Sequence, residues 1–421
     1  MSFQSYPKYK DSGVEWLGEV PEGWNVVQFK QFVDIQNGSD HKHIEQDEGY
    51  PVIGSGGCFA FASEYIYDGE SILLGRKGTI DKPLYVTGKF WTVDTMYWSK
   101  IREMVSGRFA YYTAQIIPFA YYSTNTALPS MTKGVLNSHL VCSPSYLEQQ
   151  AIAAFLDRES AKIDALVAEQ ENLIALLKEK RQAVISHAVT KGLNPTVPMK
   201  DSGIEWLGEV PAHWDVTLLK RFFRSVDYGI SDALSSEGAV AILRMGNIQN
   251  GTVVTTDLKY VDAVDPCLLL DKGDLLYNRT NSLDQIGKVG MYVGDEDIGM
   301  SFASYLVRLR VVETSIPGYF RYLLNTDGIL GIARSSAFVA IGQCNLNPTR
   351  YGEITVAIPP LNEQVAISDF LDSETAKLDD LTTEAQHTIE LLKERRSALI
   401  SAAVTGKIDV RGYHVHSPPT T

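Results

Sequence analysis

The chain has 421 residues, of which 44% are hydrophobic and 21% charged, and its formal net charge is −13. This composition is typical of a globular protein with room for two or three domains. No stretch approaches the ~18 consecutive apolar residues of a membrane span, and residues 1–13 lack the apolar core of a secretory signal. The four cysteines are widely separated and form no zinc or redox motif, so we expect a cytoplasmic protein. The acidic charge argues against a large basic surface for nucleic acid, without excluding local basic patches.

Two copies of one sequence box open the two halves of the chain. Residues 11–21 read DSGVEWLGEVP, residues 201–211 read DSGIEWLGEVP, and a tryptophan follows each copy, Trp24 and Trp214. Each box is followed by a globular segment and then by a long helical pattern. An internal repeat of this size is evidence about the fold, and it predicts a pseudo-twofold molecule.

Both globular segments show the short strands and glycine-rich turns of a mixed α/β fold. In the first, about 27–143, we expect strands over 71–74, 84–86, 96–98 and 136–142, and a helix over 108–117. In the second, about 217–358, we expect strands over 239–243, 275–277, 291–293 and 354–358, and a helix over 318–324.

The stretches from Leu147 to Val189 and from Asn362 to Val404 carry apolar residues at helical spacing. The second copy follows the first at a constant interval without a gap, the interval that separates Glu148 from Glu363. At ~1.5 Å per residue each helix would be roughly 65 Å long. The simplest prediction is an antiparallel coiled-coil pair; the alternative is that each helix packs separately against its own domain. The stripe that would pack against the other helix or a partner consists of Ile152, Leu156, Ile163, Leu166, Leu177, Val184, Ile367, Leu371, Leu378, Leu381, Leu392 and Leu399.

The sequence offers weak candidates for catalysis, and each has a simpler explanation. Ser143-Pro144-Ser145-Tyr146 is close to an amino-methyltransferase motif, but a turn that caps the following helix explains it. Asp157, Glu159 and Lys162 could hold a metal, but on a helix Glu159 and Lys162 form an i,i+3 surface pair. His41 and His43 have no third metal ligand at a suitable spacing. We therefore predict a non-catalytic chain without a metal site.

Polar side chains beside glycines, in three matching places of each segment, are candidates for contacts with DNA base edges and phosphates. Arg76 and Arg279 each follow an apolar strand, so both should project from a strand end. The complete set is Ser55, Gly56, Arg76, Lys77, Thr79, Asn125 and Lys133 in the first segment, and Arg244, Asn247, Asn278, Arg279, Asn281, Gln343 and Asn345 in the second. For any one of them, an exposed loop residue without a role is an equally good interpretation.

The two boxes, and the Glu-Gln pairs that open both long helices (Glu148-Gln149 and Glu363-Gln364), resemble the specificity subunit of type I restriction–modification systems. The resemblance implies a mixed α/β fold with two target recognition domains separated by two long antiparallel helices. The domains would cover 1–143 (with the box at 9–26) and 199–358 (with the box at 199–216). The helices would cover 144–198 and 359–421, the latter with a loose tail.

The resemblance also implies a function. Each recognition domain would read one half of a bipartite, asymmetric DNA site, while the helix pair sets the spacer and docks two methyltransferase subunits. The chain itself would need no cofactor, since S-adenosylmethionine, ATP and Mg²⁺ would belong to the methyltransferase and the restriction/translocase subunits. The alternatives are a helical scaffold that binds only protein and a self-contained DNA-modifying enzyme with unrecognised motifs.

Overall fold

The computed structural model describes residues 3–123, 129–294, 298–340 and 342–413. The chain divides into two compact units, the first made of residues 1–171 and 386–421 and the second of residues 172–385. Each unit therefore combines one globular segment with part of both long helices. None of the described helices is both long and apolar enough to cross a membrane.

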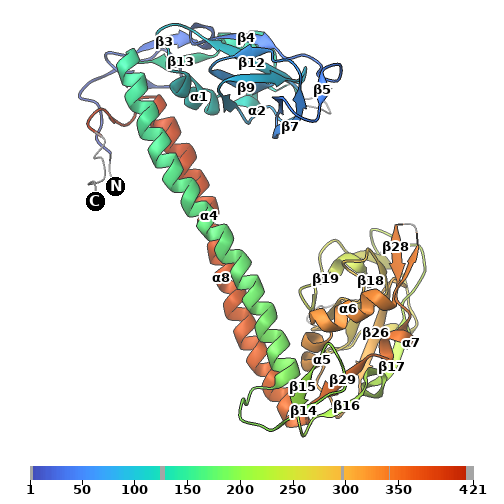
Figure 1. The fold of residues 1–421 in the computed structure, drawn as a ribbon. Coiled ribbons are helices and arrows are strands. Elements are labelled where there is room, and N and C mark those ends of the chain that lie inside the picture. The colour runs from blue at the N-terminus through green and yellow to red at the C-terminus, as the bar shows by residue number, and fades with distance from the viewer. Residues whose placement is uncertain (1–2, 124–128, 295–297, 341, 414–421) are drawn as a thin grey trace. The chain divides into compact units, whose positions relative to one another are not determined.

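In its described residues, the first unit is built from short strands in four small sheets and from short α-helices (Figure 1). Its four-stranded sheet has the order β10 (Leu84–Val86), β9 (Ser71–Gly75), β12 (Met96–Ile101), β4 (Val33–Asn37). Its five-stranded sheet has the order β5 (Glu45–Gln46), β7 (Gly57–Ala62), β6 (Tyr50–Gly54), β11 (Lys89–Thr92), β8 (Tyr67–Asp68). The box pairs β1 (Tyr9–Asp11) with β2 (Glu19–Pro21), and the helices are α1 (Gly107–Gln115), α2 (Phe119–Tyr122) and α3 (Lys133–Ser138).

The second unit follows a similar plan with a larger central sheet. Its six-stranded sheet has the order β17 (Phe223–Tyr228), β26 (Leu306–Val311), β22 (Leu275–Asn278), β24 (Val289–Met291), β20 (Thr252–Val253), β19 (Ile248–Gln249). Two three-stranded sheets have the orders β21 (Lys259–Val261), β18 (Val240–Leu243), β25 (Gly299–Phe302) and β23 (Thr280–Asn281), β28 (Gln343–Asn345), β27 (Phe338–Ala340). The second box pairs β14 (Met199–Asp201) with β15 (Glu209–Pro211), and the helices are α5 (Pro317–Leu323), α6 (Asp327–Ser336) and α7 (Pro348–Gly352).

Each globular segment starts and ends on one antiparallel strand pair. In the first unit β3 (Asn25–Gln28) pairs with β13 (Leu140–Ser143), and in the second β16 (Asp215–Leu218) pairs with β29 (Thr355–Ile358). Both pairs lead directly into a long helix. The part of each segment that differs between the two halves is thus inserted between two strands of a repeated frame.

The two long helices are α4 (Tyr146–Lys191) and α8 (Leu361–Val404), which Figure 1 shows as continuous ribbons. Within the first unit Asp164 forms an ion pair with Arg396 at 3.2 Å, and within the second Asp379 forms one with Arg181 at 3.2 Å. Together the two pairs require the helices to run antiparallel. The ion pairs are repeat equivalents, since Asp379 and Arg396 follow Asp164 and Arg181 at the interval of the repeat. The predicted antiparallel pair is confirmed.

The buried seam of this pair differs from the predicted stripe at two positions. Leu166 and Leu381 are 44% and 53% exposed, whereas Val167 and Thr382, one residue further on, are shielded. A coiled-coil seam alternates steps of four and three residues, so the step after Ile163 and Leu378 is four, not three. The remaining predicted positions (Ile152, Leu156, Ile163, Leu177, Val184, Ile367, Leu371, Leu378, Leu392 and Leu399) are buried or half-buried.

The helix ends hold the two boxes in the same way. Lys191, the last residue of α4, donates to the carbonyl oxygens of Leu207 and Glu209 in the second box. Lys407, just beyond α8, donates to the carbonyls of Leu17 and Glu19 in the first box at 2.9 and 2.6 Å. The box at the start of the chain therefore belongs structurally to the helix at its end.

Most predicted elements match the structure to within two residues. The predicted helices over 108–117 and 318–324 are α1 and α5, and the strands over 71–74 and 275–277 are β9 and β22. The strand expected over 136–142 is wrong in its first part, because residues 133–138 form α3 and the strand begins at Leu140. Thr132 caps this short helix, because its hydroxyl accepts a hydrogen bond from the Val135 N–H. The sequence prediction did not recognise this cap and assigned Leu136, an apolar residue of the helix, to the strand.

Candidate nucleic-acid interface

Arg76 lies at the end of β9 and is held by main-chain contacts on both sides. Its N–H and that of Lys77 both donate to the Thr95 carbonyl, at 2.9 and 3.2 Å, and its own carbonyl accepts from the Met131 N–H at 3.0 Å. The guanidinium donates to the Asp94 carbonyl at 3.3 Å and lies 5.8 Å from the Tyr97 ring centre. The side chain is thus orientated at the strand end while remaining partly exposed.

Arg279 occupies the equivalent position at the end of β22. Its N–H and that of Thr280 both donate to the Tyr305 carbonyl, at 3.0 and 3.2 Å, and its carbonyl accepts from the Leu346 N–H at 2.8 Å. The guanidinium donates to the Ser304 carbonyl at 3.3 Å and lies 5.0 Å from the Tyr228 ring centre. Two segments with different sequences therefore present one arginine through the same set of bonds.

The other candidates of the first unit gather around Arg76. A bridge between Lys77 and Ser130 brings the segment that precedes Lys133 beside the arginine loop, and Thr79 is exposed on the same loop. Ser55 and Gly56 form the turn after β6, which runs parallel to β11. Because parallel strands end at the same edge of a sheet, this turn lies on the side where β11 leads to Asp94 and the arginine. Asn125 lies outside the described residues.

The candidates of the second unit also converge. Strand β23 pairs with β28, which brings Asn281 beside Cys344, and the Asn345 amide donates to the Thr280 hydroxyl at 3.1 Å. Arg244, Gln343 and Tyr305 line one open hollow of about 560 Å³. Arg244 is tied to Asp257 by bonds of 2.6 Å to its carbonyl and 2.8 Å to its carboxylate, so part of its donor capacity is already used.

Two predicted contact residues are buried, and the prediction is wrong for them as direct DNA contacts. Asn247 is 4% exposed; its Oδ1 accepts from the Arg244 N–H at 2.8 Å, and its Nδ2 donates to the carbonyls of Val254 and Thr256 at 2.9 and 2.8 Å. Asn278 is 1% exposed at the end of β22. Both amides lie beneath the loops that carry the exposed candidates. A polar residue next to an arginine has the same sequence appearance whether it faces solvent or supports the loop.

The sequence prediction missed the exposed aromatic residues of these loops. Tyr305 and Tyr228 are about half exposed beside Arg279, and Phe59 is exposed beyond the turn at Ser55. Aromatic rings at such places can stack on bases or pack against sugars. A signal existed for Tyr228, which directly precedes Gly229 and so meets the rule used for the polar candidates, but none existed for Tyr305, which has no glycine beside it.

Asp157, considered above as a metal ligand, and its repeat equivalent Asp372 anchor the globular segments to the helices. The Tyr112 hydroxyl donates to Asp157 at 2.6 Å, and the Tyr322 hydroxyl donates to Asp372 at 2.7 Å. Each aspartate also pairs with an arginine of its segment, Arg108 or Arg321. Burial, with the hydrogen bond to the carboxylate, raises the pKa of both tyrosines. No group of residues suited to hold a metal ion occurs in the described part of the chain.

The glutamines of the two Glu-Gln pairs, Gln149 and Gln364, have a clear structural role. Gln149 accepts a hydrogen bond from the Ser106 N–H at 2.9 Å and donates to the Pro144 carbonyl at 3.0 Å. Gln364 accepts from the Ile316 N–H at 3.0 Å and donates to the Pro359 carbonyl at 3.0 Å. Each glutamine is buried and joins the start of a long helix to the first turn of α1 or α5.

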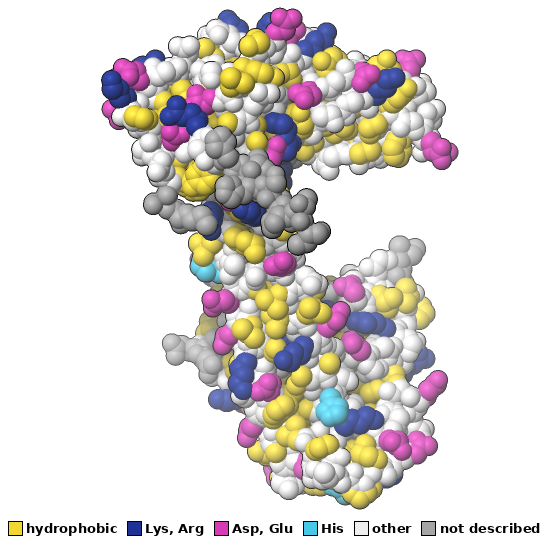
Figure 2. Space-filling model, turned by 60° about the vertical axis from the view of Figure 1, so that its left-hand side comes forward, with side chains coloured by type: hydrophobic (Ala, Val, Ile, Leu, Met, Phe, Trp, Pro, Cys, Tyr) yellow, Lys and Arg dark blue, Asp and Glu magenta, His cyan; other side chains and the backbone are white. Residues whose placement is uncertain are grey.

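Charge on the surface is mixed. On the face shown in Figure 2, basic side chains alternate with acidic ones over both globular parts, without one extended basic field. The arginines described above are therefore local features, and strong binding to DNA phosphates by this chain alone is not the expectation from its charge.

Comparison with known proteins agrees with this architecture. Residues 21–175 match the family model described as type I restriction modification DNA specificity domain. The specificity subunit of the EcoKI type I restriction enzyme from Escherichia coli K12 is 24% identical over 63% of this chain, which spans 57% of that protein's length. The EcoBI specificity subunit of Escherichia coli is 21% identical over 97% of this chain and 91% of its own.

Solved structures share the fold. A chain from a study of complex assembly and conformational transition of the type I R-M system has a TM-score of 0.70 at 14% identity, over 91% of this chain and 98% of that one. The HsdS subunit from Thermoanaerobacter tengcongensis gives a TM-score of 0.51 at 13% identity, over 92% and 98%. The repeated boxes, the paired helices and these matches agree: the chain is similar in sequence and in fold to type I restriction–modification specificity subunits.

Proposed function

We propose that this chain is the sequence-specific DNA-binding subunit of a type I restriction–modification complex and has no catalytic activity of its own. Each globular segment would read one half of a bipartite, asymmetric site. The observation that carries the proposal is the equivalence of Arg76 and Arg279. Each is fixed by the same four kinds of contact on an otherwise different segment, as expected of two readers on one frame. Arginine is the side chain best suited to bidentate contacts with guanine or phosphate.

The helix pair would dock two copies of a methyltransferase subunit. Support comes from large apolar side chains that lie exposed at repeat-equivalent positions of both helices, Leu166 with Leu381 and Leu176 with Leu391. Exposed leucines on helices that already bury a seam indicate further protein contacts. Because they recur at the interval of the repeat, they fit two identical partners better than one.

The cofactors would belong to the partner subunits. S-adenosylmethionine would serve the methyltransferase subunits, and ATP with Mg²⁺ would serve the restriction/translocase subunits. This division fits a chain with acidic net charge, because partners would supply many of the phosphate contacts.

The length of the helices would set the spacer between the two half-sites. Helices of 46 and 44 residues offer many turns that could be removed in matched pairs. Deleting seven residues from each keeps the seam in phase, since seven is one repeat of the seam. We expect such a deletion to shorten the tolerated spacer, and an unchanged spacer would contradict this part of the proposal.

Mapping of methylated bases in a host genome tests the central claim. The host would carry this chain, the neighbouring methyltransferase gene, both, or neither. Methylated adenines at a two-part motif with a fixed gap, seen only with both genes, are the expected result. A purified complex of the two proteins that yields no such motif would instead support a helical scaffold without DNA reading.

A further inference from the structure

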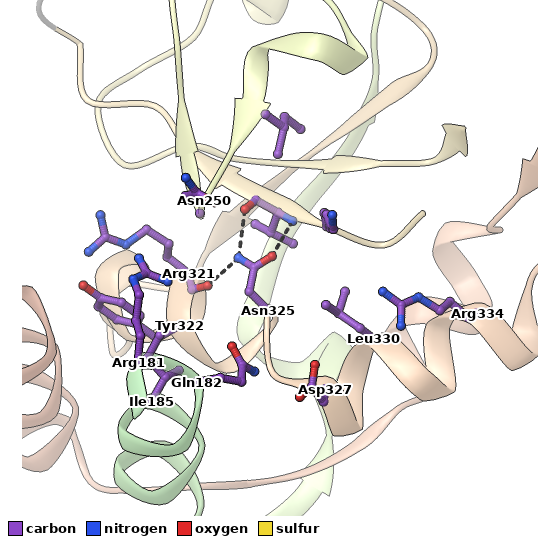
Figure 3. A pocket seen from close by; sticks show the side chains of 14 residues that line it. Arg181, Gln182, Ile185, Asn250, Arg321, Tyr322, Asn325, Asp327, Leu330 and Arg334 are labelled. Carbon is purple, nitrogen blue, oxygen red and sulfur yellow. Dashed lines mark hydrogen bonds between the residues drawn. The ribbon is translucent and has the colours of Figure 1, made fainter. Parts of the chain in front are cut away.

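A hollow of about 250 Å³ in the second unit is unusually rich in cationic side chains. It lies between α4, the helices α5 and α6, and the strands β19 and β24. Figure 3 shows Arg181 and Gln182 rising from α4 on one side and Arg334 reaching in from α6 on the other. Arg321 and Lys288 complete the basic lining, and among the described residues Asp327 is the one carboxylate that lines it.

Four buried nitrogen atoms of this lining donate no hydrogen bond to any of the described residues. They are Nε of Arg181, Arg321 and Arg334, and Nε2 of Gln182. Nε of Arg181 does lie 3.2 Å from an Asp379 oxygen, an ion pair that lacks the alignment of a hydrogen bond. All four atoms are donors, so the hollow is short of acceptors. These four atoms are covered by protein and do not themselves reach into the hollow, but as polar N–H groups without acceptors they add to the positive potential of its walls.

The charges of the lining are only partly compensated. Arg181 pairs with Asp379 and Arg321 with Asp372. Lys288 and Arg334 make hydrogen bonds to uncharged groups, the Gln285 side chain at 2.9 Å and the Asp284 carbonyl at 3.3 Å. After these two ion pairs, Lys288 and Arg334 remain among the described residues as unpaired cations and Asp327 as the one carboxylate of the lining, so the hollow keeps an excess of positive charge.

The repeated frame does not require this arrangement. In the first unit, Arg396 is the equivalent of Arg181 and donates to Gln115 at 3.4 Å besides pairing with Asp164. At the interval of the repeat, the equivalent of Gln182 is Ser397. The unsatisfied arginine nitrogen is therefore part of the repeated frame, since Nε of Arg396 is also buried without an acceptor in the described part of the chain, whereas the amide donor of Gln182 is an addition of the second unit.

We propose that this hollow binds a phosphate group. Phosphate offers several acceptor oxygens and a full negative charge, and arginine together with lysine is the usual means of holding it. The group could come from a free polyphosphate or from the backbone of bound DNA. Only the second source rests on the proposed function.

The test uses the whole chain and two probes, inorganic pyrophosphate and duplex DNA that contains the mapped site. Lys288→Gln and Arg334→Gln each remove one uncompensated cation. Arg350→Gln is the matched control, because Arg350 also donates one bond of 3.3 Å to a main-chain carbonyl but does not line the hollow. Asp327→Asn removes the carboxylate and should act in the opposite direction.

If the phosphate is free, calorimetry should show pyrophosphate binding that weakens about tenfold in Lys288→Gln and Arg334→Gln, strengthens in Asp327→Asn, and is unchanged in the control. If the phosphate belongs to DNA, the same pattern should appear in DNA affinity, with the slope of log affinity against log salt reduced by about one. A response to pyrophosphate in a chain that reads no DNA would support the hollow and refute the proposed function. Equal behaviour of the two site variants and the control with both probes would refute the hollow as a phosphate site.

Discussion

Replacing Asn247 by alanine should destabilise the second unit rather than abolish a base contact. The side chain is buried and makes three hydrogen bonds, all to main-chain groups of residues 244–256. Because the partners are one N–H and two carbonyls, the amide orientation is unambiguous. Removal would leave three main-chain groups without their partner at about 1 kcal/mol each, or about 3 kcal/mol in total.

Hydrogen exchange is the suitable assay, because two units need not unfold as one and a single unfolding free energy would be ill defined. Amides of residues 247–254 in Asn247→Ala should exchange about 100-fold faster, which corresponds to about 3 kcal/mol. Amides of the first unit should be unaffected. Gln343→Ala, an exposed neighbour at the same hollow, is the control and should leave exchange unchanged. Unchanged protection in Asn247→Ala together with lost recognition of one half-site would refute the structural role and restore the residue as a reader.

Three further predictions follow from the contacts described. Arg76→Ala should remove recognition of one half-site and Arg279→Ala recognition of the other, as measured by methylation of half-site variants. Assembly with the partner subunits should persist in both variants. Loss of assembly would show that the arginines are misassigned. Leu166→Asp should weaken binding to the methyltransferase subunit in a pull-down with little effect on folding. Ile163→Asp, which places a charge in the buried seam, should destabilise the chain by about 3 kcal/mol or more. Equal effects of the two substitutions on folding and on partner binding would refute the docking surface. Burial lowers the pKa of His139 to about 4, below its ordinary 6.5, so the unfolded chain takes up a proton first as pH falls. The contribution to stability is intact above pH 6.5 and declines by about 3 kcal/mol towards pH 4. Hydrogen exchange of first-unit amides, corrected for the intrinsic effect of pH, should show a smaller loss of protection over that window in His139→Gln than in the native chain.

The repeated frame was predictable because it repeats. One constant interval between the two copies fixes both long helices, and the boxes fix where each half begins. The error at Leu166 and Leu381 has a simple origin: steps of three and four are equally helical, and only the partner helix decides which one lies in the seam. Periodicity within one helix does not contain that information.

The candidate DNA-contact loops were predictable in position but not in detail. Arg76 and Arg279 follow buried strands, and that rule places them correctly at a strand end. The rule fails for Asn247 and Asn278, because an asparagine beside an arginine has the same sequence appearance whether its side chain faces solvent or, as in Asn247, bonds main-chain groups of its own loop. The hollow around Gln182 was missed because its lining comes from α4, α5, α6 and two strands, which are far apart in the sequence.

The anchors show what the frame demands of a globular segment. Asp157 and Asp372 are repeat equivalents. The tyrosines that donate to them, Tyr112 and Tyr322, are not at the interval of the repeat but play the same part, each six residues after the residue whose N–H is bonded to the helix glutamine. The arginines that complete the anchors are not equivalent: Arg108 precedes its tyrosine by four residues, whereas Arg321 directly precedes Tyr322. On a helix these two spacings project differently, yet both guanidinium groups reach the same carboxylate, so the contact is preserved while its sequence position is not. A segment therefore fits the frame if it supplies the closing strand pair, one free N–H for the glutamine, and a tyrosine and an arginine within reach of the aspartate. The two segments differ between those points, and the candidate DNA-contact loops lie there.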